Sequence, residues 1–339
     1  MKTIHSKSIA LVFFCLLIFQ FSCKNDDDKD HDPPSDVEIL VTEITNITVI
    51  EHFAGNAMVQ YNGRLWLAGG DVQFDQDANF MVYNSSNGST WNEVLNDAPT
   101  TRRYKPSLTV FGNAMWLIGG LDGSLNLHED IWTSSNGENW TSVLSHAPFG
   151  GTAFQHCFVH NNKLILVTGY QGLPGPSHNS VWSTVDGINW TQENASAFPY
   201  RYGSSFVFFQ NEFYVVGGTT NGTNFSNEIW KSSDGVNWSQ VATSGSIFSG
   251  RALHTTTVHN GKVWLIGGEN SSTPYADLWY SSDMIHWTEH TDLPSAAQAI
   301  KLHSALDYNG KIWVFGGEYF DAAESAWKLQ GKIQTLEEL

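Results

Sequence analysis

The feature that most constrains the fold of this 339-residue chain is a motif that recurs about every 50 residues. An apolar run ending in Gly-Gly occurs five times, and Thr168-Gly169 occupies the sixth place. The second glycines of the six motifs are separated by 50, 49, 49, 50 and 49 residues. Such a fixed period indicates that one supersecondary unit is copied along the chain. The pairs are Gly69-Gly70, Gly119-Gly120, Gly217-Gly218, Gly267-Gly268 and Gly316-Gly317.

All fourteen tryptophans fall in three columns of this repeat, which makes them architectural by position. The first column follows the second glycine by about twelve residues: Tyr83, Trp132, Trp182, Trp230, Trp279 and Trp327. The second comes eight residues later: Trp91, Trp140, Trp190, Trp238 and Trp287. The third stands four residues before the second glycine: Trp66, Trp116, Ile165, Tyr214, Trp264 and Trp313.

Each period contains four strand-like runs joined by turn residues. In the fifth period, Asn260-Gly261 separates the first two runs and Ser282-Asp283 separates the last two, as in β-hairpins. The runs are Leu253–His259, Val263–Ile266, Asp277–Ser281 and Trp287–His290. Four antiparallel strands at this period predict one blade of a propeller, and hence an all-β fold with six blades.

The apolar run before Gly-Gly, the later tryptophan and an arginine before the first strand resemble the kelch repeat across residues 38–330. This resemblance implies a six-bladed kelch-type β-propeller of the galactose oxidase-like superfamily. Val41–Ile44 aligns with the outer strands, so we expect this N-terminal strand to close the ring. Residues 331–339 are expected to be a C-terminal tail, although residues 335–339 have the spacing of an alternative closing strand.

The N-terminus predicts export. Two lysines precede an apolar run from Ile9 to Phe21, which is typical of a signal peptide over residues 1–22. Ser22-Cys23 resembles a bacterial lipobox, although Gln20 replaces the usual aliphatic residue, and plain signal cleavage is the alternative. The acidic residues that follow resemble the surface-export signal of some Gram-negative lipoproteins. We therefore expect Cys23 to carry lipid, residues 23–37 to be a flexible acidic tether, and the protein to face outward on the outer membrane.

Charge and cysteine usage exclude several classes of function. The chain has 17 basic and 34 acidic residues, and its formal charge of −17 argues against nucleic acid as a partner. Only Cys157 remains in the body, which excludes an internal disulfide and a cysteine-based zinc cluster there. We expect no cofactor, no metal and a monomer that contacts the membrane only through its lipid anchor.

Three arginines occupy one repeat position, seventeen residues before the second glycine: Arg103, Arg201 and Arg251. Guanidinium groups bind carboxylates in a bidentate way, so these arginines predict a clamp for an anionic ligand. The alternative is a framework role, because acids also share one repeat position at Asp130, Glu228 and Asp277. Kelch domains that bind acidic peptides use arginines of this kind, as the resemblance implies.

Loops on one face of the predicted propeller differ between blades, and variable loops on a rigid scaffold are where function usually resides. There, Tyr104, Tyr202 and Tyr319 are candidates for stacking on a sugar. His254 and His303 begin innermost strands and serve either in a metal ring or, as the simpler alternative, in the channel wall.

These features predict a surface-anchored, non-catalytic binding or scaffold propeller for a glycan or an acidic peptide or protein. The alternative is a carbohydrate-active enzyme, such as a sialic acid-type epimerase, a mutarotase or a glycosidase, but no catalytic residue stands out. The Ser-Ser-Asn/Asp-Gly-x-x-Trp series resembles the Asp-box of sialidases, and we interpret it as a structural turn.

Overall fold

The computed structural model describes residues 39–44, 54–70, 80–95, 102–176, 178–271, 273–291, 298–324, 326–329 and 333–338. Every regular element in these residues is a β-strand. No helix that is long and apolar enough to cross a membrane occurs in this described part. The chain divides into Met1–Asp36 and Val37–Leu339, and the predicted signal 1–22, Cys23 and the tether 23–37 lie outside the described residues.

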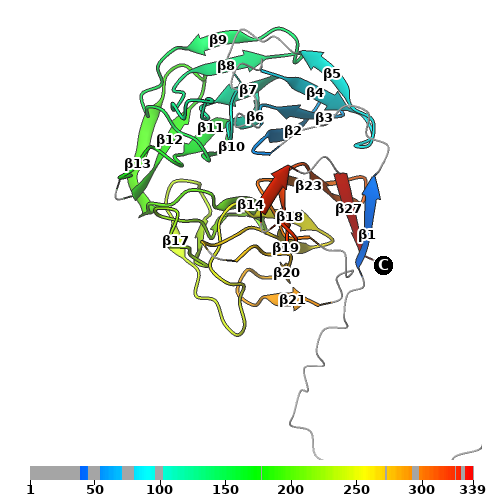
Figure 1. Ribbon diagram of the computed structural model, residues 1–339. Helices are drawn as coiled ribbons and strands as arrows, with labels where there is room; N and C mark the ends of the chain where they lie inside the picture. The colour runs from blue at the N-terminus through cyan, green and yellow to red at the C-terminus, as the bar shows by residue number, and fades with distance from the viewer. Residues whose placement is uncertain are drawn as a thin grey trace, which may run out of the picture. The chain divides into compact units, whose positions relative to one another are not determined.

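Five four-stranded antiparallel sheets are each built from one continuous stretch of chain, with neighbouring strands in sequence order. The first two are β2 (Ala57–Tyr61), β3 (Arg64–Ala68), β4 (Val82–Ser85) and β5 (Asn92–Leu95), then β6 (Ser107–Phe111), β7 (Ala114–Ile118), β8 (Ile131–Ser134) and β9 (Thr141–Leu144). The third and fourth are β10 (His156–His160), β11 (Lys163–Val167), β12 (His178–Thr184) and β13 (Thr191–Pro199), then β14 (Ser205–Phe209), β15 (Glu212–Val216), β16 (Ile229–Ser232) and β17 (Ser239–Gln240). The fifth is β18 (Thr255–His259), β19 (Lys262–Ile266), β20 (Leu278–Ser281) and β21 (Thr288–His290). The first strands lie toward the middle of this arrangement and the fourth strands at its periphery (Figure 1).

A sixth four-stranded sheet combines segments from both ends of the repeat region. Its order is β1-β27-β24-β23, built from β23 (Ser304–Tyr308), β24 (Lys311–Phe315), β27 (Ile333–Glu338) and β1 (Ile39–Ile44). The N-terminal strand β1 lies at the outer edge of the sheet. The C-terminal residues, expected as a tail or an alternative outer strand, instead form the third strand, which pairs with both β24 and β1.

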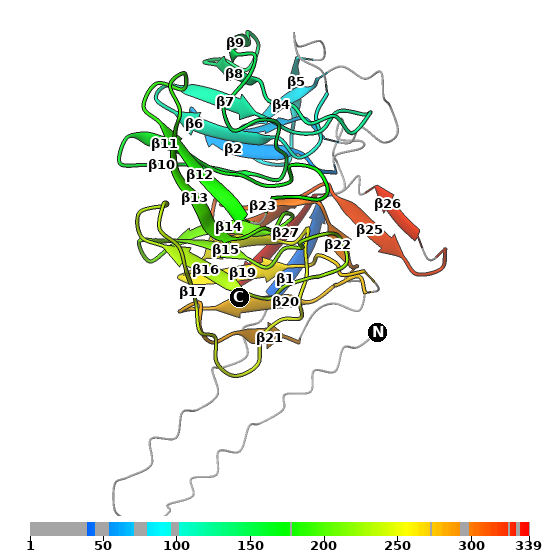
Figure 2. The ribbon, with the colours of Figure 1, turned by 90° about the vertical axis from the view of Figure 1, so that its left-hand side faces the viewer.

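The side chains of β27 explain this difference. Ile333 and Leu336 are 1% and 7% exposed and belong to two different hydrophobic clusters. The repeat alignment assigns the third place to the segment around Trp327, and that assignment is wrong. This segment forms β26 (Ala326–Leu329), which joins β25 (Glu318–Asp321) and β22 (Ile300–Lys301) in a separate three-stranded sheet. Figure 2 shows β25 and β26 projecting beside the larger sheets.

Buried hydrophobic side chains fill the spaces between the four-stranded sheets. The described residues form six such clusters, and five of them join two sheets that are consecutive in the order given above. One cluster joins the sixth sheet to the first, with Leu65 and Trp91 packed against Trp313 and Phe315. Trp91 and Phe315 meet edge to face at 5.4 Å between ring centroids. Repeat-column tryptophans therefore pack sheet against sheet.

The turn between β8 and β9 shows why the Ser-Ser-Asn-Gly sequence recurs. Ser134 Oγ accepts a hydrogen bond from the Gly137 backbone N–H at 2.8 Å, and Asn136 Oδ1 accepts from the next two N–H groups at 3.0 and 2.9 Å. Gly137 has a φ of +78°, and a Cβ there would lie 2.0 Å from the ring of Trp66 in the neighbouring sheet. Glycine is needed for both reasons, so the motif acts as a structural turn.

Candidate functional site

The three repeat arginines are buried and paired. Arg103 and Arg251 are 0% exposed and Arg201 is 4% exposed. Each guanidinium also donates a hydrogen bond to the carbonyl of the first glycine of its Gly-Gly pair, at 3.0 to 3.4 Å. The ion pairs are Arg103–Asp130 at 2.7 Å, Arg201–Glu228 at 2.5 Å and Arg251–Asp277 at 2.5 Å. These contacts support the framework alternative, because the guanidinium groups are engaged inside the molecule.

The pair of Arg103 and Asp130 also stays charged over a wide pH range. Burial alone would raise the pKa of Asp130, but hydrogen bonds from His128 and Arg103 and the charge of Arg103 hold it well below its usual range. A carboxylate held in this way remains ionised and keeps its guanidinium partner. The contacts of all three arginines therefore favour the framework alternative over the ligand clamp.

Two residues after the arginine position, every repeat has a residue in the left-handed backbone region. We call these six the axial residues: Gly55, Lys105, Phe154, Gly203, Leu253 and Leu302, with φ from +50° to +72°. Backbone hydrogen bonds link them from repeat to repeat: Lys105 N to Gly55 O at 2.7 Å, Phe154 N to Lys105 O at 3.1 Å, Leu253 N to Gly203 O at 2.7 Å, Leu302 N to Leu253 O at 2.9 Å and Gly55 N to Leu302 O at 2.9 Å. A bulky side chain in this conformation costs about 1–3 kcal/mol, and such strain clusters at functional sites.

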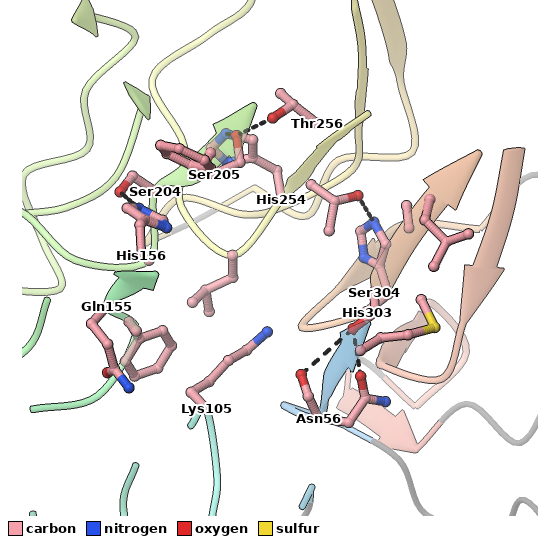
Figure 3. Close-up of a pocket in the computed structure, with 18 of the residues that line it drawn as sticks. Asn56, Lys105, Gln155, His156, Ser204, Ser205, His254, Thr256, His303 and Ser304 are labelled. Carbon is pink, nitrogen blue, oxygen red and sulfur yellow. Dashed lines mark hydrogen bonds between the residues drawn. The ribbon is translucent and has the colours of Figure 1, made fainter. Parts of the chain in front are cut away.

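A cavity of about 300 Å³ lies beside the axial residues Lys105, Phe154, Gly203 and Leu253. The rest of its wall comes largely from the starts of inner strands. Its polar side chains are Asn56, Gln155, His156, Ser204, Ser205, His254, Thr255, Thr256, His303 and Ser304. This volume is at the lower end of the range for small-molecule sites, and polar groups converge on it from several sheets (Figure 3).

Lys105 directs its side chain into this cavity (Figure 3). The amine of this side chain makes no hydrogen bond or ion pair with another residue in the described part of the chain. Burial lowers the pKa of Lys105 to about 8, while the charge of Glu318 acts in the opposite direction. At neutral pH the amine is therefore mostly protonated and places a positive charge in the cavity.

Side-chain hydrogen bonds run along the cavity wall from one sheet to the next, and we call them the polar belt. Each links the first residue of an inner strand to the residue that precedes the inner strand of the next repeat. The pairs are His156–Ser204 at 3.0 Å, Ser205–His254 at 3.0 Å, Thr255–His303 at 2.7 Å and Ser304–Asn56. The last pair joins the sixth sheet to the segment that enters the first.

The three histidines of the polar belt are neutral at pH 7. Burial lowers the pKa of His156 to about 4 and that of His303 to about 3, and it holds the pKa of His254 well below its usual value. Within the described residues, no three His, Cys, Asp or Glu side chains are grouped so that they could hold a metal ion. His254 and His303 thus lie in the cavity wall, hydrogen-bonded to neighbouring hydroxyls.

Of the three predicted rim tyrosines, the structure brings two together. The ring of Phe154 lies between Tyr104 and Tyr202, with a centroid distance of 5.9 Å to each. Tyr202 also contacts Tyr170 at 5.0 Å, and we call these four rings the aromatic wall. Tyr319 lies apart from them on β25, and none of the three predicted tyrosines lines the cavity; only Phe154 of these rings does.

The two most informative site residues, Lys105 and Phe154, are absent from the sequence prediction of the site. A signal for Lys105 was nevertheless available in the repeat. The position fifteen residues before the second glycine is glycine, phenylalanine or leucine in the other five repeats, so Lys105 is the one charged residue in that column. This repeat position cannot be recognised as part of a site before the fold is known, because nothing in the sequence shows that its six residues come together in space.

Comparison with known proteins identifies a family and a fold. Residues 139–317, more than half of the chain, match the family profile described as the KLHDC2/KLHL20/DRC7 Kelch-repeats domain. Among the 564 solved chains that match is one titled "Structure of YjhT", with a TM-score of 0.63 and 14% identity over 84% of this chain and 95% of that chain. At this identity the likeness concerns the fold alone. No curated protein sequence matches the chain.

Proposed function

The chain belongs to the kelch-repeat family, and from this premise we propose that it is a binding propeller whose central cavity holds a small anionic ligand. The observation that carries the proposal is the side chain of Lys105, which enters the cavity without an ion-pair partner among the described residues. A protonated amine that is partly shielded from water attracts an anion more strongly than an exposed one does. Lys105 thereby takes the place that the sequence analysis gives to the arginines.

The cavity favours binding over catalysis. A carbohydrate-active enzyme, the alternative function, needs an acid–base group whose pKa lies near the working pH. The described lining residues include neither Asp nor Glu. Their imidazoles have pKa values far below 7, and each makes a hydrogen bond to a hydroxyl group of the wall. The lining groups can therefore orient a ligand, but they are poorly matched to proton transfer at neutral pH.

Calorimetric titration of the full chain with glucuronate and with glucose tests the proposal, because these sugars differ in one carboxylate. We expect glucuronate to bind and glucose not to bind. Lys105→Met should lower the affinity for glucuronate by at least about tenfold. Lys163→Met is the matched control, since the Lys163 side chain is 47% exposed and its ammonium pairs with Glu193. Equal binding of both sugars, or unchanged affinity in Lys105→Met, would contradict the proposal.

We also propose that the six four-stranded sheets are the blades of a closed six-bladed ring. Three kinds of contact between the last sheet and the first support this arrangement. Trp91 packs on Phe315, the Gly55 N–H donates to Leu302 O at 2.9 Å, and Ser304 donates to Asn56. In such a ring β1 is the outermost strand of the last blade, next to β27.

For location, we propose a lipid anchor at Cys23 and an outward orientation on an outer membrane. In this orientation the ligand would come from the medium outside the cell. The support is the sequence of the N-terminal segment: a short apolar run, Ser22-Cys23 and acidic residues after it. Cys23→Ala should move the protein from the membrane fraction to the soluble fraction. Protease treatment of intact cells should remove the propeller, and protection until lysis would contradict the outward orientation.

A further inference from the structure

The axial residues define the ligand more closely, and we propose that the central cavity binds a small aromatic carboxylate, with its carboxylate at Lys105 and its ring against Phe154. This inference rests on the proposed function, in which the cavity holds an anion. Three axial side chains line the cavity: Lys105 is cationic, Phe154 aromatic and Leu253 aliphatic. The combination suits a ligand with one negative charge and an apolar body.

Lys105 and Phe154 are adjacent at the axis. The Phe154 N–H donates to Lys105 O at 3.1 Å, and the two residues have similar φ angles of +58° and +50°. Because they hold the same backbone conformation at equivalent repeat positions, their side chains leave the backbone in equivalent directions, and both line the cavity. A small anion bound to Lys105 therefore has the rest of its body beside the ring of Phe154.

Neighbouring aromatic rings hold the ring of Phe154 in place at the cavity. Tyr104 and Tyr202 each lie 5.9 Å from this ring, at interplanar angles of 78° and 56°, which are favourable arrangements for aromatic contacts. The next axial residue is Gly203, where a Cβ would lie 3.0 Å from the Leu253 side chain. The Leu253 side chain therefore lies close against the Gly203 backbone, so the cavity has an aromatic side chain on one side of Gly203 and an aliphatic one on the other.

The polar part of the wall argues for an aromatic body rather than a polyhydroxylated one. The side chains of the polar belt already bond to one another, as in His156–Ser204 and Thr255–His303 at 3.0 and 2.7 Å. A sugar would have to exchange its hydrogen bonds to water for hydrogen bonds to side chains that already have partners. The net gain in binding free energy from such an exchange is small. An aromatic ring needs no hydrogen-bond partners, and its transfer out of water is favourable.

Four probes separate the parts of this ligand: phenylacetate carries both ring and charge, acetate the charge alone, 2-phenylethanol the ring without charge, and glucuronate the charge on a sugar. In calorimetric titrations of the full chain at pH 7, we expect phenylacetate to bind at least about tenfold more tightly than each of the others. Phe154→Ala should weaken phenylacetate by about tenfold and leave acetate unchanged. If the alanine variant does not fold, Phe154→Leu replaces it, because leucine retains much of the side-chain volume. This variant should also bind phenylacetate more weakly than the wild type does.

Phe208→Ala is the control for loss of a phenylalanine, because Phe208 is 50% exposed and does not line the cavity. If glucuronate or acetate binds as tightly as phenylacetate, or if both Phe154 variants bind phenylacetate normally, the aromatic ligand is excluded. The proposed function then still stands, provided that Lys105→Met weakens the anions. If Lys105→Met binds every anion normally, the proposed function and this inference both fail.

Discussion

A half-buried lysine without a carboxylate partner among the described residues makes the proposed binding depend on pH in a defined direction. The pKa of Lys105 is lowered to about 8 by burial, so the amine loses its charge above this pH, where His156 and His303 are already neutral. We expect the affinity for glucuronate to fall by about tenfold per pH unit well above pH 8. Lys105→Arg should bind equally well at pH 7 and pH 9.5, because guanidinium keeps its charge. A wild-type affinity that does not change between these pH values would contradict the assignment.

The buried arginines lead to the opposite expectation, an effect on stability without an effect on binding. Arg251→Ala leaves Asp277 without the guanidinium that holds it at 2.5 Å, and breaking a buried pair in this way costs about 3–5 kcal/mol. Urea unfolding should show this loss, while glucuronate binding by the folded fraction stays normal. Arg64→Ala is the control, since Arg64 is exposed and bonds only to Asn84 among the described residues. Lost binding at unchanged stability would return Arg251 to the ligand site.

At the scale of strands, the repeat predicts most of the fold because each blade repeats the same local signals. Apolar runs, Asn-Gly turns and the tryptophan columns lie within one period, and five sheets follow the sequence order. The sixth sheet breaks this order because two segments compete for its third place. Trp327 has the right spacing, but Ile333 and Leu336 fill the cores on the two sides, and such competition is decided by tertiary packing. The grouping of the axial residues cannot be predicted from local sequence signals either, because these residues are one repeat period apart in the chain.

The role of β27 can be tested with one side chain. Leu336 is 7% exposed and packs in a cluster with Trp264 and Ile312, so Leu336→Ala should destabilise the protein by about 2–5 kcal/mol. Leu125→Ala should have almost no effect, because Leu125 is 72% exposed. Thermal unfolding of both variants measures the difference. If Leu336→Ala unfolds at the wild-type temperature, residues 333–338 behave as the tail that the sequence predicts.

In the proposed function, framework and ligand recognition in the body of residues 37–339 belong to separate sets of residues. Hydrophobic clusters occur between all six four-stranded sheets, and a buried arginine pairs with an acid in three of the six repeats. The axial side chains differ from repeat to repeat on this common backbone. One backbone conformation thus presents a cationic, an aromatic and an aliphatic side chain to the same cavity.

The polar belt makes the stability of this body sensitive to acid. An unfolded histidine binds its proton near pH 6.5, whereas His156 and His303 in the folded protein do so only near pH 4 and pH 3. Between these values the unfolded state binds more protons, so the free energy of unfolding is largest above pH 6.5 and declines as pH falls. Each unit of pKa difference contributes about 1.4 kcal/mol, and the decline should reach several kcal/mol by pH 4.5. Urea unfolding at pH 7.5, 6 and 4.5 measures it.

His303→Gln removes one of these protonation sites and should make the decline shallower, even if the variant is less stable at pH 7.5. His146→Gln is the matched control, because the His146 side chain is 78% exposed and should leave the wild-type slope unchanged. Among carboxylates held by hydrogen bonds, Asp130 and Asp234 have pKa values lowered below their usual range, so their protonation acts mainly below this window. A wild-type free energy of unfolding that is constant from pH 7.5 to 4.5, or an identical slope in His303→Gln, would show that the belt histidines do not govern the acid response.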